Sequence, residues 1–334
     1  MKNIGVNGFG RIGRCFTRVS LSENSFDIAV VNDLSDIKTL AHLFKYDSVH
    51  GVNPHKFEII DNSLVFESGK KIVFTQFKNP EDIPWGQHNV DVVLESTGVF
   101  RLKNEALRHL KGGAKKVVIS APAQDEVQTI VLGVNESSLD KKEVVFSNAS
   151  CTTNNAAPMV KVIKGLMEIE SAYITTVHSY TSDQRLHDSP HKDLRRARAA
   201  NLSIVPTTTG AAKAITRIFP DLEGKIGGCG IRVPVPNGSM TDLTFVVKKP
   251  KSIEEINKAM KDASENELKG ILGYTSDPIV SVDVIGSSYS CLFDSELTSV
   301  IGNMIKVVGW YDNEAGYSHR LVELIERITK KGEV

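Results

Sequence analysis

A run of polar residues around one cysteine is the stretch of this 334-residue chain with the most chemical potential. Residues 147–154 read Ser-Asn-Ala-Ser-Cys-Thr-Thr-Asn and place Cys151 at a predicted strand-to-helix junction. A helix N-terminus stabilises a thiolate, and its free N–H groups can hold a developing oxyanion. Pro158, however, predicts that this helix begins near residue 158, because an interior proline loses a backbone hydrogen bond. Cys151 is therefore either a nucleophile or a buried cysteine in a polar cap.

A reactive thiol needs a base, and the chain offers nine histidines. His178 is the best placed of them, since it follows an apolar strand over 173–177 and precedes polar residues. A residue at the end of a strand beside a loop is well placed to face a cleft. His187 and His191 lie in a polar loop and are expected to face solvent or a neighbouring subunit. We therefore predict that Cys151 pairs with His178.

The first predicted strand leads directly into a glycine-rich turn, Gly8-Phe-Gly-Arg-Ile-Gly13, which opens a helical pattern. In that context the three glycines allow a tight turn, and the helix N-terminus presents N–H groups to a pyrophosphate. Asp33 follows twenty residues after Gly13, at the end of the second predicted strand. A carboxylate there can bind the ribose hydroxyls of NAD and repel the 2′-phosphate of NADP. The alternative is a structural turn with a surface aspartate.

These residues must be positioned by elements that the apolar pattern also predicts. In the first 150 residues, short apolar strands alternate with helices; the strands are expected at 4–6, 28–31, 90–94 and 116–119. Such strands are typical of a parallel sheet covered on both faces by helices. Residues 51–77 alternate apolar and polar side chains instead and predict a small antiparallel insertion.

After about residue 150 the pattern changes to longer strands, expected at 242–248 and 305–311. A capping box at Ser252–Glu255 predicts a helix between them. Apolar residues at helical spacing over 316–330 predict a C-terminal helix that packs on another part of the chain. We expect one domain over 1–150, to which a helix at 315–334 returns, and a second, α+β domain over 151–314.

The composition excludes several classes of protein. Forty Lys and Arg balance forty Asp and Glu, which argues against nucleic acid as a main partner. The chain is 41% hydrophobic and has no apolar run long enough to span a membrane and no signal peptide, so we expect a soluble cytoplasmic protein. Four scattered cysteines are too few for a disulfide scaffold or a zinc site, so we expect free thiols and no metal.

Five motifs, taken together and in this order, resemble one enzyme family. They are residues 147–154, His178-Ser-Tyr-Thr181, Asp193-Leu-Arg-Arg-Ala-Arg198, Pro206-Thr-Thr-Thr-Gly210 and Trp310-Tyr-Asp-Asn-Glu314. Over essentially its full length the chain is similar to phosphorylating, NAD-dependent glyceraldehyde-3-phosphate dehydrogenases. The resemblance implies a Rossmann-type NAD-binding domain with a parallel sheet, and an α+β catalytic and tetramerisation domain with a largely antiparallel sheet.

The resemblance also implies the reaction and its residues. Glyceraldehyde 3-phosphate would be oxidised reversibly with NAD and inorganic phosphate to 1,3-bisphosphoglycerate, through a thiohemiacetal and a thioester on Cys151, with His178 moving protons. Thr181 and Arg232 would hold the substrate phosphate, and an arginine of 195–198 would assist them. The attacking phosphate would be held by Ser150, Thr152, Thr209 and Gly210. The cofactor would be bound by Gly8, Gly10, Arg11, Ile12, Gly13, Asp33, Lys78, Ser120 and Asn313, the last at the nicotinamide amide.

The chain departs from the family pattern at a few positions. Asn155 replaces a second cysteine that many members carry, Lys78 replaces an arginine near the adenine, and residues 188–190 read Asp-Ser-Pro where Leu-Pro is common. A low activity with NADP is compatible with that last change. The alternatives are an erythrose-4-phosphate dehydrogenase and a non-catalytic dinucleotide-binding relative. The loop at about 180–200 would, by the same resemblance, cross to a neighbouring subunit of a homotetramer.

Overall fold

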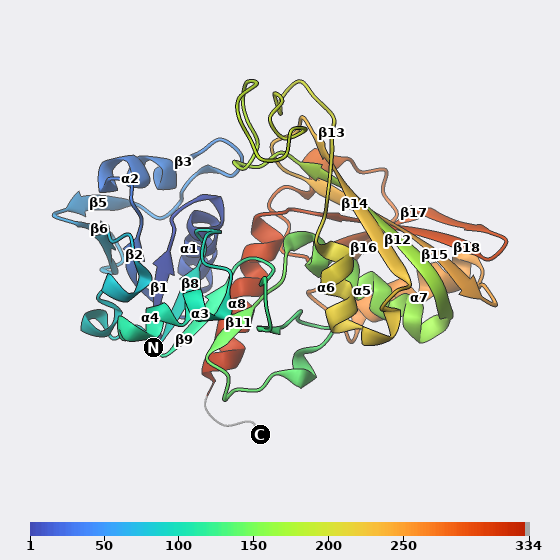
Figure 1. Ribbon diagram of the computed structural model, residues 1–334, viewed down its shortest axis with the longest axis horizontal. Coiled ribbons are helices and arrows are strands. Elements are labelled where there is room, and N and C mark those ends of the chain that lie inside the picture. The colour runs from blue at the N-terminus through green and yellow to red at the C-terminus, as the bar shows by residue number, and fades with distance from the viewer. Residues whose placement is uncertain (331–334) are drawn as a thin grey trace. The chain divides into compact units, whose positions relative to one another are not determined.

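The computed structural model describes residues 1–330, and these form two compact units (Figure 1). The first unit comprises Met1–Ile130, Ser137–Ala149 and the chain from Ser318 onward. The second comprises Val131–Glu136 and Ser150–Tyr317. The last four residues of the tail helix predicted at 315–334 lie outside the described part of the chain.

The first unit is built on a nine-stranded sheet with the order β10-β11-β9-β8-β1-β2-β7-β6-β5. Neighbours from β10 to β7 run parallel, whereas β5, β6 and β7 pair antiparallel at one edge. The strands are β1 (Asn3–Asn7), β2 (Asp27–Asn32), β5 (Phe57–Ile60), β6 (Ser63–Phe66), β7 (Lys71–Thr75), β8 (Val92–Glu95), β9 (Lys116–Ile119), β10 (Gln128–Thr129) and β11 (Val145–Ser147). The predicted parallel sheet and the antiparallel hairpin in residues 51–77 are both confirmed. A separate ribbon pairs β3 (Tyr46–Asp47) with β4 (Gly51–Val52).

Five α-helices of the described chain lie wholly or mostly in this unit. They are α1 (Arg11–Glu23), α2 (Ile37–Lys45), α3 (Lys103–Ala106), α4 (Arg108–Lys111) and most of α8 (Ala315–Thr329). The tail helix α8 is tied to the end of α1, because His319 Nδ1 lies 2.8 Å from a carboxylate oxygen of Glu23. Since β1 ends at Asn7 and α1 begins at Arg11, the glycine-rich turn occupies the strand-to-helix junction.

The second unit is built on a seven-stranded, largely antiparallel sheet with the order β13-β14-β12-β15-β18-β17-β16. Among the described strands of this sheet, only the β12–β14 and β16–β17 pairs run parallel. The strands are β12 (Glu168–Ser179), β13 (Val205–Thr207), β14 (Ile226–Val233), β15 (Ser239–Lys248), β16 (Leu272–Thr275), β17 (Cys291–Ile301) and β18 (Met304–Tyr311). The prediction of an α+β second half with strands near 242–248 and 305–311 is confirmed.

Three helices cover one face of this sheet: α5 (Cys151–Leu166), α6 (Ala211–Ile218) and α7 (Ile253–Glu265) (Figure 1). Buried and half-buried residues alternate along β15, as expected when one sheet face is packed and the other is not. Ser252 and Glu255 form the predicted capping box of α7. No helix in residues 1–330 has the length and apolar character needed to cross a membrane.

The expectation that the helix after Cys151 begins near Pro158 is wrong. Helix α5 begins at Cys151, and Pro158 lies inside it. The missing N–H of Pro158 removes one internal hydrogen bond, but residues 152–160 of this helix are all buried. Tertiary packing therefore outweighs the local cost of the proline.

Candidate active site

The second unit brings the predicted thiol and imidazole together. Cys151 is the first residue of α5, and His178 is the last but one of β12. The Sγ of Cys151 lies 3.5 Å from the Nε2 of His178. The two residues come from a helix start and a strand end that the sequence separates by 27 positions.

The thiol sits where a helix begins. Ser150 is the N-cap of α5, and its Oγ accepts the backbone N–H of Thr153 at 3.1 Å. Burial raises the pKa of the Cys151 thiol, whereas the charge of Arg232 and the N–H groups of Thr152 and Cys151 lower it. The effect of burial is the larger, so the pKa of Cys151 in the free protein lies above that of a thiol in water and the thiol is protonated. The positive groups around it oppose this rise in pKa.

His178 is held on its other side by backbone. Its Nδ1 lies 2.7 Å from the carbonyl oxygen of Ser179, which can only accept a hydrogen bond. In the tautomer that carries its proton on Nδ1, this carbonyl accepts that proton and the lone pair of Nε2 faces Cys151. Burial lowers the pKa of His178 to about 3, and the charge of Arg232 acts in the same direction. The imidazole is therefore neutral in the free protein.

Arg232 lies beside this pair on β14, directly opposite His178 in the parallel β12–β14 register. Its NH1 contacts His178 Nδ1 and donates to the carbonyl of Ser179 at 2.9 Å. Among the arginines of 195–198, Arg196 is the one whose charge acts on both His178 and Arg232. The sequence did not distinguish Arg196 from its neighbours, because only the folded chain places it near the pair.

A buried tyrosine that the motif reading left without a role connects the two catalytic elements. The hydroxyl of Tyr311 lies 2.9 Å from Oγ1 of Thr152 and 3.0 Å from Oγ1 of Thr176. Its ring packs edge-on against the ring of His178, with centroids 5.9 Å apart. One phenol thus joins the first turn of α5 to β12, two residues before the imidazole. Sequence spacing gives no indication of this contact, which spans 159 positions.

The remaining predicted phosphate residues lie on segments next to this pair. Thr181 follows β12 by two residues, and its N–H donates to Oε1 of Gln184 at 3.3 Å. Gly210 is the N-cap of α6, and Oγ1 of Thr209 accepts the N–H of Ala211 at 3.2 Å. None of these three predicted residues, Thr181, Thr209 or Gly210, has a contact with Cys151 among those the structure shows within residues 1–330.

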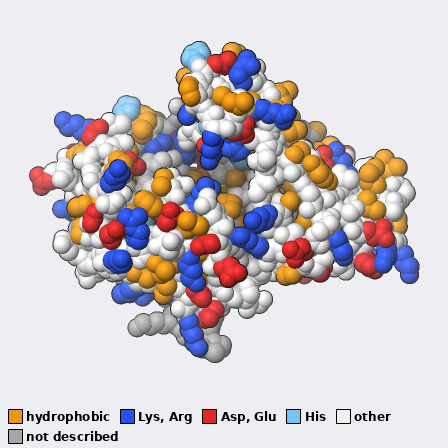
Figure 2. All heavy atoms as spheres, in the orientation of Figure 1, with side chains coloured by type: hydrophobic (Ala, Val, Ile, Leu, Met, Phe, Trp, Pro, Cys, Tyr) orange, Lys and Arg blue, Asp and Glu red, His pale blue; other side chains and the backbone are white. Residues whose placement is uncertain are grey.

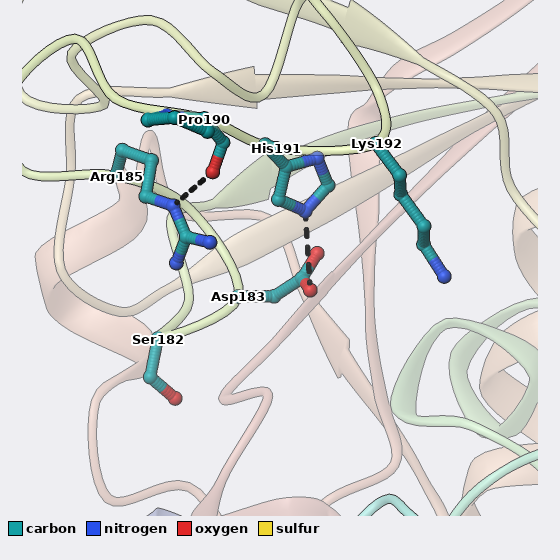
Figure 3. Close-up of a pocket in the computed structure, with 6 residues that line it drawn as sticks. All are labelled: Ser182, Asp183, Arg185, Pro190, His191 and Lys192. Atoms are coloured by element: carbon teal, nitrogen blue, oxygen red, sulfur yellow. Dashed lines mark hydrogen bonds and ion pairs between the residues drawn. The ribbon is translucent and has the colours of Figure 1, made fainter.

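The loop after Thr181 is ordered by its own ion pairs. Asp183 binds Arg196, whose Nε donates to Oγ1 of Thr207 at 3.0 Å. Figure 3 shows the outer side of this arrangement, where the His191 ring faces the Asp183 carboxylate and Arg185 donates to the carbonyl of Pro190. A hollow of about 570 Å³ lies there, lined by Ser182, Asp183, Arg185, Pro190, His191 and Lys192.

The predicted phosphate turn has the required backbone geometry in the first unit. Gly8 has a φ of +93°, and a Cβ there would stand 2.7 Å from the backbone nitrogen of Thr97. A Cβ on Gly13 would stand 2.2 Å from the carbonyl oxygen of Gly8. Gly10, the N-cap of α1, has open space where its Cβ would be. Two glycines thus allow the chain to close on itself, and the third leaves the turn open to a ligand.

Asp33 is held toward the same turn. Its Oδ2 accepts the N–H of Phe9 at 2.7 Å, and its Oδ1 accepts the N–H of Ser35 at 2.9 Å. The carboxylate is therefore fixed beside the glycines, one residue after β2 ends. This is the position at which an acidic side chain contacts the ribose of a dinucleotide.

The other cofactor residues predicted in the first unit are Arg11, Ile12, Lys78 and Ser120. Arg11 binds Asp47 at 2.7 Å. Burial would raise the pKa of Asp47, but the N–H groups of His50 and Val49 and the charge of Arg11 lower it to about 2. Ile12 is half-buried on α1, Lys78 is exposed, and the N–H of Ser120 donates to the carbonyl of Glu95 at 2.9 Å.

A buried network beneath the turn was not predicted. Oε2 of Glu95 accepts the amide of Asn7 at 2.6 Å and lies 3.0 Å from Nε2 of His109. The indole N–H of Trp85 donates to Nδ1 of His109 at 3.1 Å, and the N–H of Thr97 donates to Oε1 of Glu95 at 2.9 Å. The one sequence signal that could have indicated this network is Glu95 itself, a charged residue at the end of an otherwise apolar strand. Within residues 1–330, no group of His, Cys, Asp and Glu is arranged to hold a metal ion.

Asn313 lies in the second unit, between β18 and α8. Its Oδ1 accepts the hydroxyls of Ser179 at 2.8 Å and Ser239 at 2.9 Å. The preceding Asp312 accepts the N–H groups of Glu314 and Ala315, both at 2.8 Å. Backbone and side chain of Asn313 are both fixed by these bonds.

Comparisons with known proteins match both halves of the chain. Residues 2–103 match the glyceraldehyde 3-phosphate dehydrogenase NAD-binding domain, and residues 150–313 match the C-terminal domain of the same family. The chain is 53% identical over 331 residues to glyceraldehyde-3-phosphate dehydrogenase of Geobacillus stearothermophilus, covering 98% of each chain. It is 53% identical over 333 residues to that of Thermotoga maritima, covering 99% of this chain and 100% of the relative. The predicted resemblance, fold class and NAD cofactor are confirmed.

Proposed function

Because this chain belongs to the glyceraldehyde 3-phosphate dehydrogenase family, we propose that it oxidises glyceraldehyde 3-phosphate with NAD and inorganic phosphate to 1,3-bisphosphoglycerate. The observation that carries the chemistry is the 3.5 Å contact between Cys151 Sγ and His178 Nε2 at the start of a helix. A thiol beside a neutral imidazole can form a covalent adduct with an aldehyde, and the charge of the neighbouring Arg232 favours the thiolate.

The first unit fits the dinucleotide by its shape. The positive φ of Gly8 and the 2.2 Å approach that a Cβ on Gly13 would make to Gly8 leave room only for glycine there. The N–H groups at the start of α1 can then hold the pyrophosphate, and Asp33 can bind the ribose. Bound NAD would supply the hydride acceptor. Asn313 would anchor the nicotinamide amide through its Nδ2.

The first covalent step uses Cys151 and His178. The sulfur attacks the aldehyde carbon, its proton passes to Nε2 of His178, and the imidazolium returns that proton to the new alkoxide. The N–H groups at the start of α5 stabilise the oxygen while it carries charge. The product is a thiohemiacetal on Cys151, and His178 is again neutral.

The second step oxidises that adduct and the third releases it. His178 takes the hydroxyl proton as hydride leaves the carbon, so that a thioester remains on Cys151. An oxygen of inorganic phosphate then attacks the thioester carbon, and the C–S bond breaks. The sulfur leaves as a thiolate and takes back the proton held by His178. The energy of oxidation is thereby kept in an acyl phosphate.

The phosphate groups would be held by the cationic and hydroxyl-bearing residues around the pair. We assign the substrate phosphate to Thr181 and Arg232, with Arg196 as the assisting arginine, because Arg196 acts electrostatically on His178 and Arg232. The attacking phosphate is assigned to Ser150, Thr152, Thr209 and Gly210. Hydroxyls, guanidinium groups and helix N–H groups are the usual ligands of phosphate oxygens.

The test is the formation of NADH with each component omitted in turn. The proposal expects NADH only when glyceraldehyde 3-phosphate, NAD and phosphate or arsenate are all present. A rate that does not depend on phosphate contradicts the thioester cleavage. A higher kcat/KM with erythrose 4-phosphate favours that substrate instead, and no rate with either aldehyde indicates a non-catalytic dinucleotide-binding protein.

We also propose that the chain works as a homotetramer in the cytoplasm. In the single chain, Leu194 is 82% exposed and Leu202 is 79% exposed, although both lie in a loop ordered by ion pairs. Figure 2 shows hydrophobic and basic side chains next to one another on this loop, at the top of the view. A subunit interface on this loop would bury both leucines. The four free cysteines are compatible with a reducing compartment.

A further inference from the structure

Two buried serines converge on the amide of Asn313. The hydroxyl of Ser179 donates to its Oδ1 at 2.8 Å, and the hydroxyl of Ser239 donates to the same oxygen at 2.9 Å. Ser179 is 0% exposed, Ser239 is 1% exposed and Asn313 is 6% exposed. The three residues lie at neighbouring ends of β12, β15 and β18, since β15 pairs with both other strands.

The hydrogen bonds set which end of the amide faces the serines. Oγ of Ser239 already accepts the backbone N–H of Ser179 at 3.1 Å, which directs its own hydrogen toward Asn313. An amide oxygen has two lone pairs and accepts both hydroxyls. Turning the amide by half a rotation would leave two buried hydroxyl hydrogens without these acceptors, which is unfavourable. Nδ2 therefore points away from the two serines.

Ser179 also holds the base, but through a different atom. Its carbonyl oxygen lies 2.7 Å from Nδ1 of His178 and accepts NH1 of Arg232 at 2.9 Å. Its side chain serves Asn313 and its backbone serves the proton-transferring pair. A substitution that removes the hydroxyl leaves the carbonyl in place, so that the two roles can be separated by experiment.

We infer that Ser179 and Ser239 are positioning residues that fix the amide of Asn313, and through it the rotation of the nicotinamide ring. The inference rests on the proposed function, in which Asn313 donates Nδ2 to the carboxamide oxygen of the cofactor. A ring held at its carboxamide presents one face for hydride transfer. Losing the hydroxyls lets the amide turn, so that the ring is bound less tightly and both of its faces become accessible.

The test compares Ser179→Ala, Ser239→Ala and the double variant with the wild-type protein. Losing one of these hydrogen bonds should raise the KM for NAD about 2- to 10-fold, and the double variant should exceed either single variant. The KM for glyceraldehyde 3-phosphate and the rate of Cys151 alkylation by iodoacetamide should stay within about twofold of wild type. The alkylation rate shows whether the carbonyl of Ser179 still holds His178 beside Cys151, since replacing the side chain leaves that carbonyl in place.

The second readout is stereochemical. NADH with deuterium at one C4 position is used in the reverse reaction, and the label is traced in the aldehyde. Wild-type protein should transfer hydrogen from one face only, whereas the double variant should transfer a measurable fraction from the other. Ser295→Ala is the matched control, because Oγ of Ser295 is also a buried donor, to the carbonyl of Thr275 at 2.8 Å, in the same sheet.

Epistasis distinguishes positioning from general damage. In an Asn313→Ala background, Ser179→Ala should change neither the KM for NAD nor the label transfer any further. Additive effects in that background, or single variants that bind NAD and transfer label as wild type does, overturn the inference. A fall in the rate of Cys151 alkylation as large as the rise in the KM for NAD also overturns the inference. If the wild-type protein itself makes no NADH from the aldehyde and phosphate, the proposed function fails rather than this assignment.

Discussion

Nε2 of His178 lies 3.5 Å from Sγ of Cys151, while Nδ1 of the same ring lies 2.7 Å from a backbone carbonyl. In the tautomer that carries its proton on Nδ1, the ring can accept a second proton on Nε2, the nitrogen that faces the thiol. Burial lowers the pKa of His178 to about 3, so that the ring is neutral over the ordinary pH range. Nε2 of this neutral ring is the atom that receives the thiol proton when the sulfur attacks an aldehyde.

Replacing Cys151 with serine should abolish NADH formation. A hydroxyl ionises far less than a thiol, so we expect activity to fall by about 10⁴-fold or more. NAD binding, measured by fluorescence titration, should persist. Cys229→Ser is the control, because Cys229 lies on β14, where its Sγ is 3.8 Å from Oγ1 of Thr175 and its side chain also interacts with Tyr173. Turnover retained in Cys151→Ser contradicts the assignment of the nucleophile.

Replacing Arg232 with glutamine should move thiolate formation to higher pH. Burial raises the pKa of Cys151 and the charge of Arg232 opposes this, so losing the charge raises that pKa further. The rate of alkylation by neutral iodoacetamide, measured against pH, should therefore rise at a higher pH than in the wild-type protein. Arg195→Gln should leave the profile unchanged. A profile that moves to lower pH in Arg232→Gln would show that Arg232 does not stabilise the thiolate.

Replacing Asp33 with glycine should increase the relative use of NADP. The carboxylate is fixed by the N–H groups of Phe9 and Ser35, so it cannot turn away from an added 2′-phosphate. We expect the ratio of kcat/KM values for NADP and NAD to rise about tenfold, which corresponds to about 1.4 kcal/mol. Asp36→Ser, which keeps the N-cap of α2, is the control. An unchanged ratio assigns the discrimination to another residue.

Replacing Glu95 with glutamine should destabilise the protein. The carboxylate accepts the amide of Asn7 and the N–H of Thr97, and it lies 3.0 Å from Nε2 of His109. The NH₂ group of a glutamine would face N–H donors that need an acceptor, which should lower the free energy of unfolding by about 2–3 kcal/mol. Urea unfolding should show a lower midpoint, and the KM for NAD should rise, because Asn7 precedes the phosphate turn. Glu67→Gln, whose side chain is exposed, should shift the midpoint little.

Replacing Leu194 with aspartate should dissociate the proposed tetramer. A charge buried in a subunit interface loses its hydration, so the assembly should fall to dimers or single chains by light scattering after gel filtration. Ile60→Asp, at the exposed end of β5, introduces the same charge outside the loop and should leave the mass unchanged. A wild-type mass of one chain, or an unchanged mass in Leu194→Asp, contradicts a role for this loop in assembly.

Local patterns identified much of this protein because the relevant residues are neighbours in sequence. The turn from Gly8 to Gly13, the strand before it and Asp33 follow from period and spacing, and Cys151 stood out by its polar neighbours. The same local reasoning was wrong about Pro158. The cost of a proline is a local quantity, whereas the burial that outweighs it depends on a sheet formed elsewhere in the chain.

Tertiary structure alone decided which side chains meet. Ser179 and Asn313 are separated by 134 residues, and Tyr311 and Thr152 by 159. Serine, asparagine and tyrosine occur throughout the chain, so their types carry no information about partners. Pairing of strands from distant segments brings these groups within hydrogen-bonding distance, and burial makes each partner obligatory. Sequence thus determined which chemistry the chain can do, and the fold determined the orientation in which it does it.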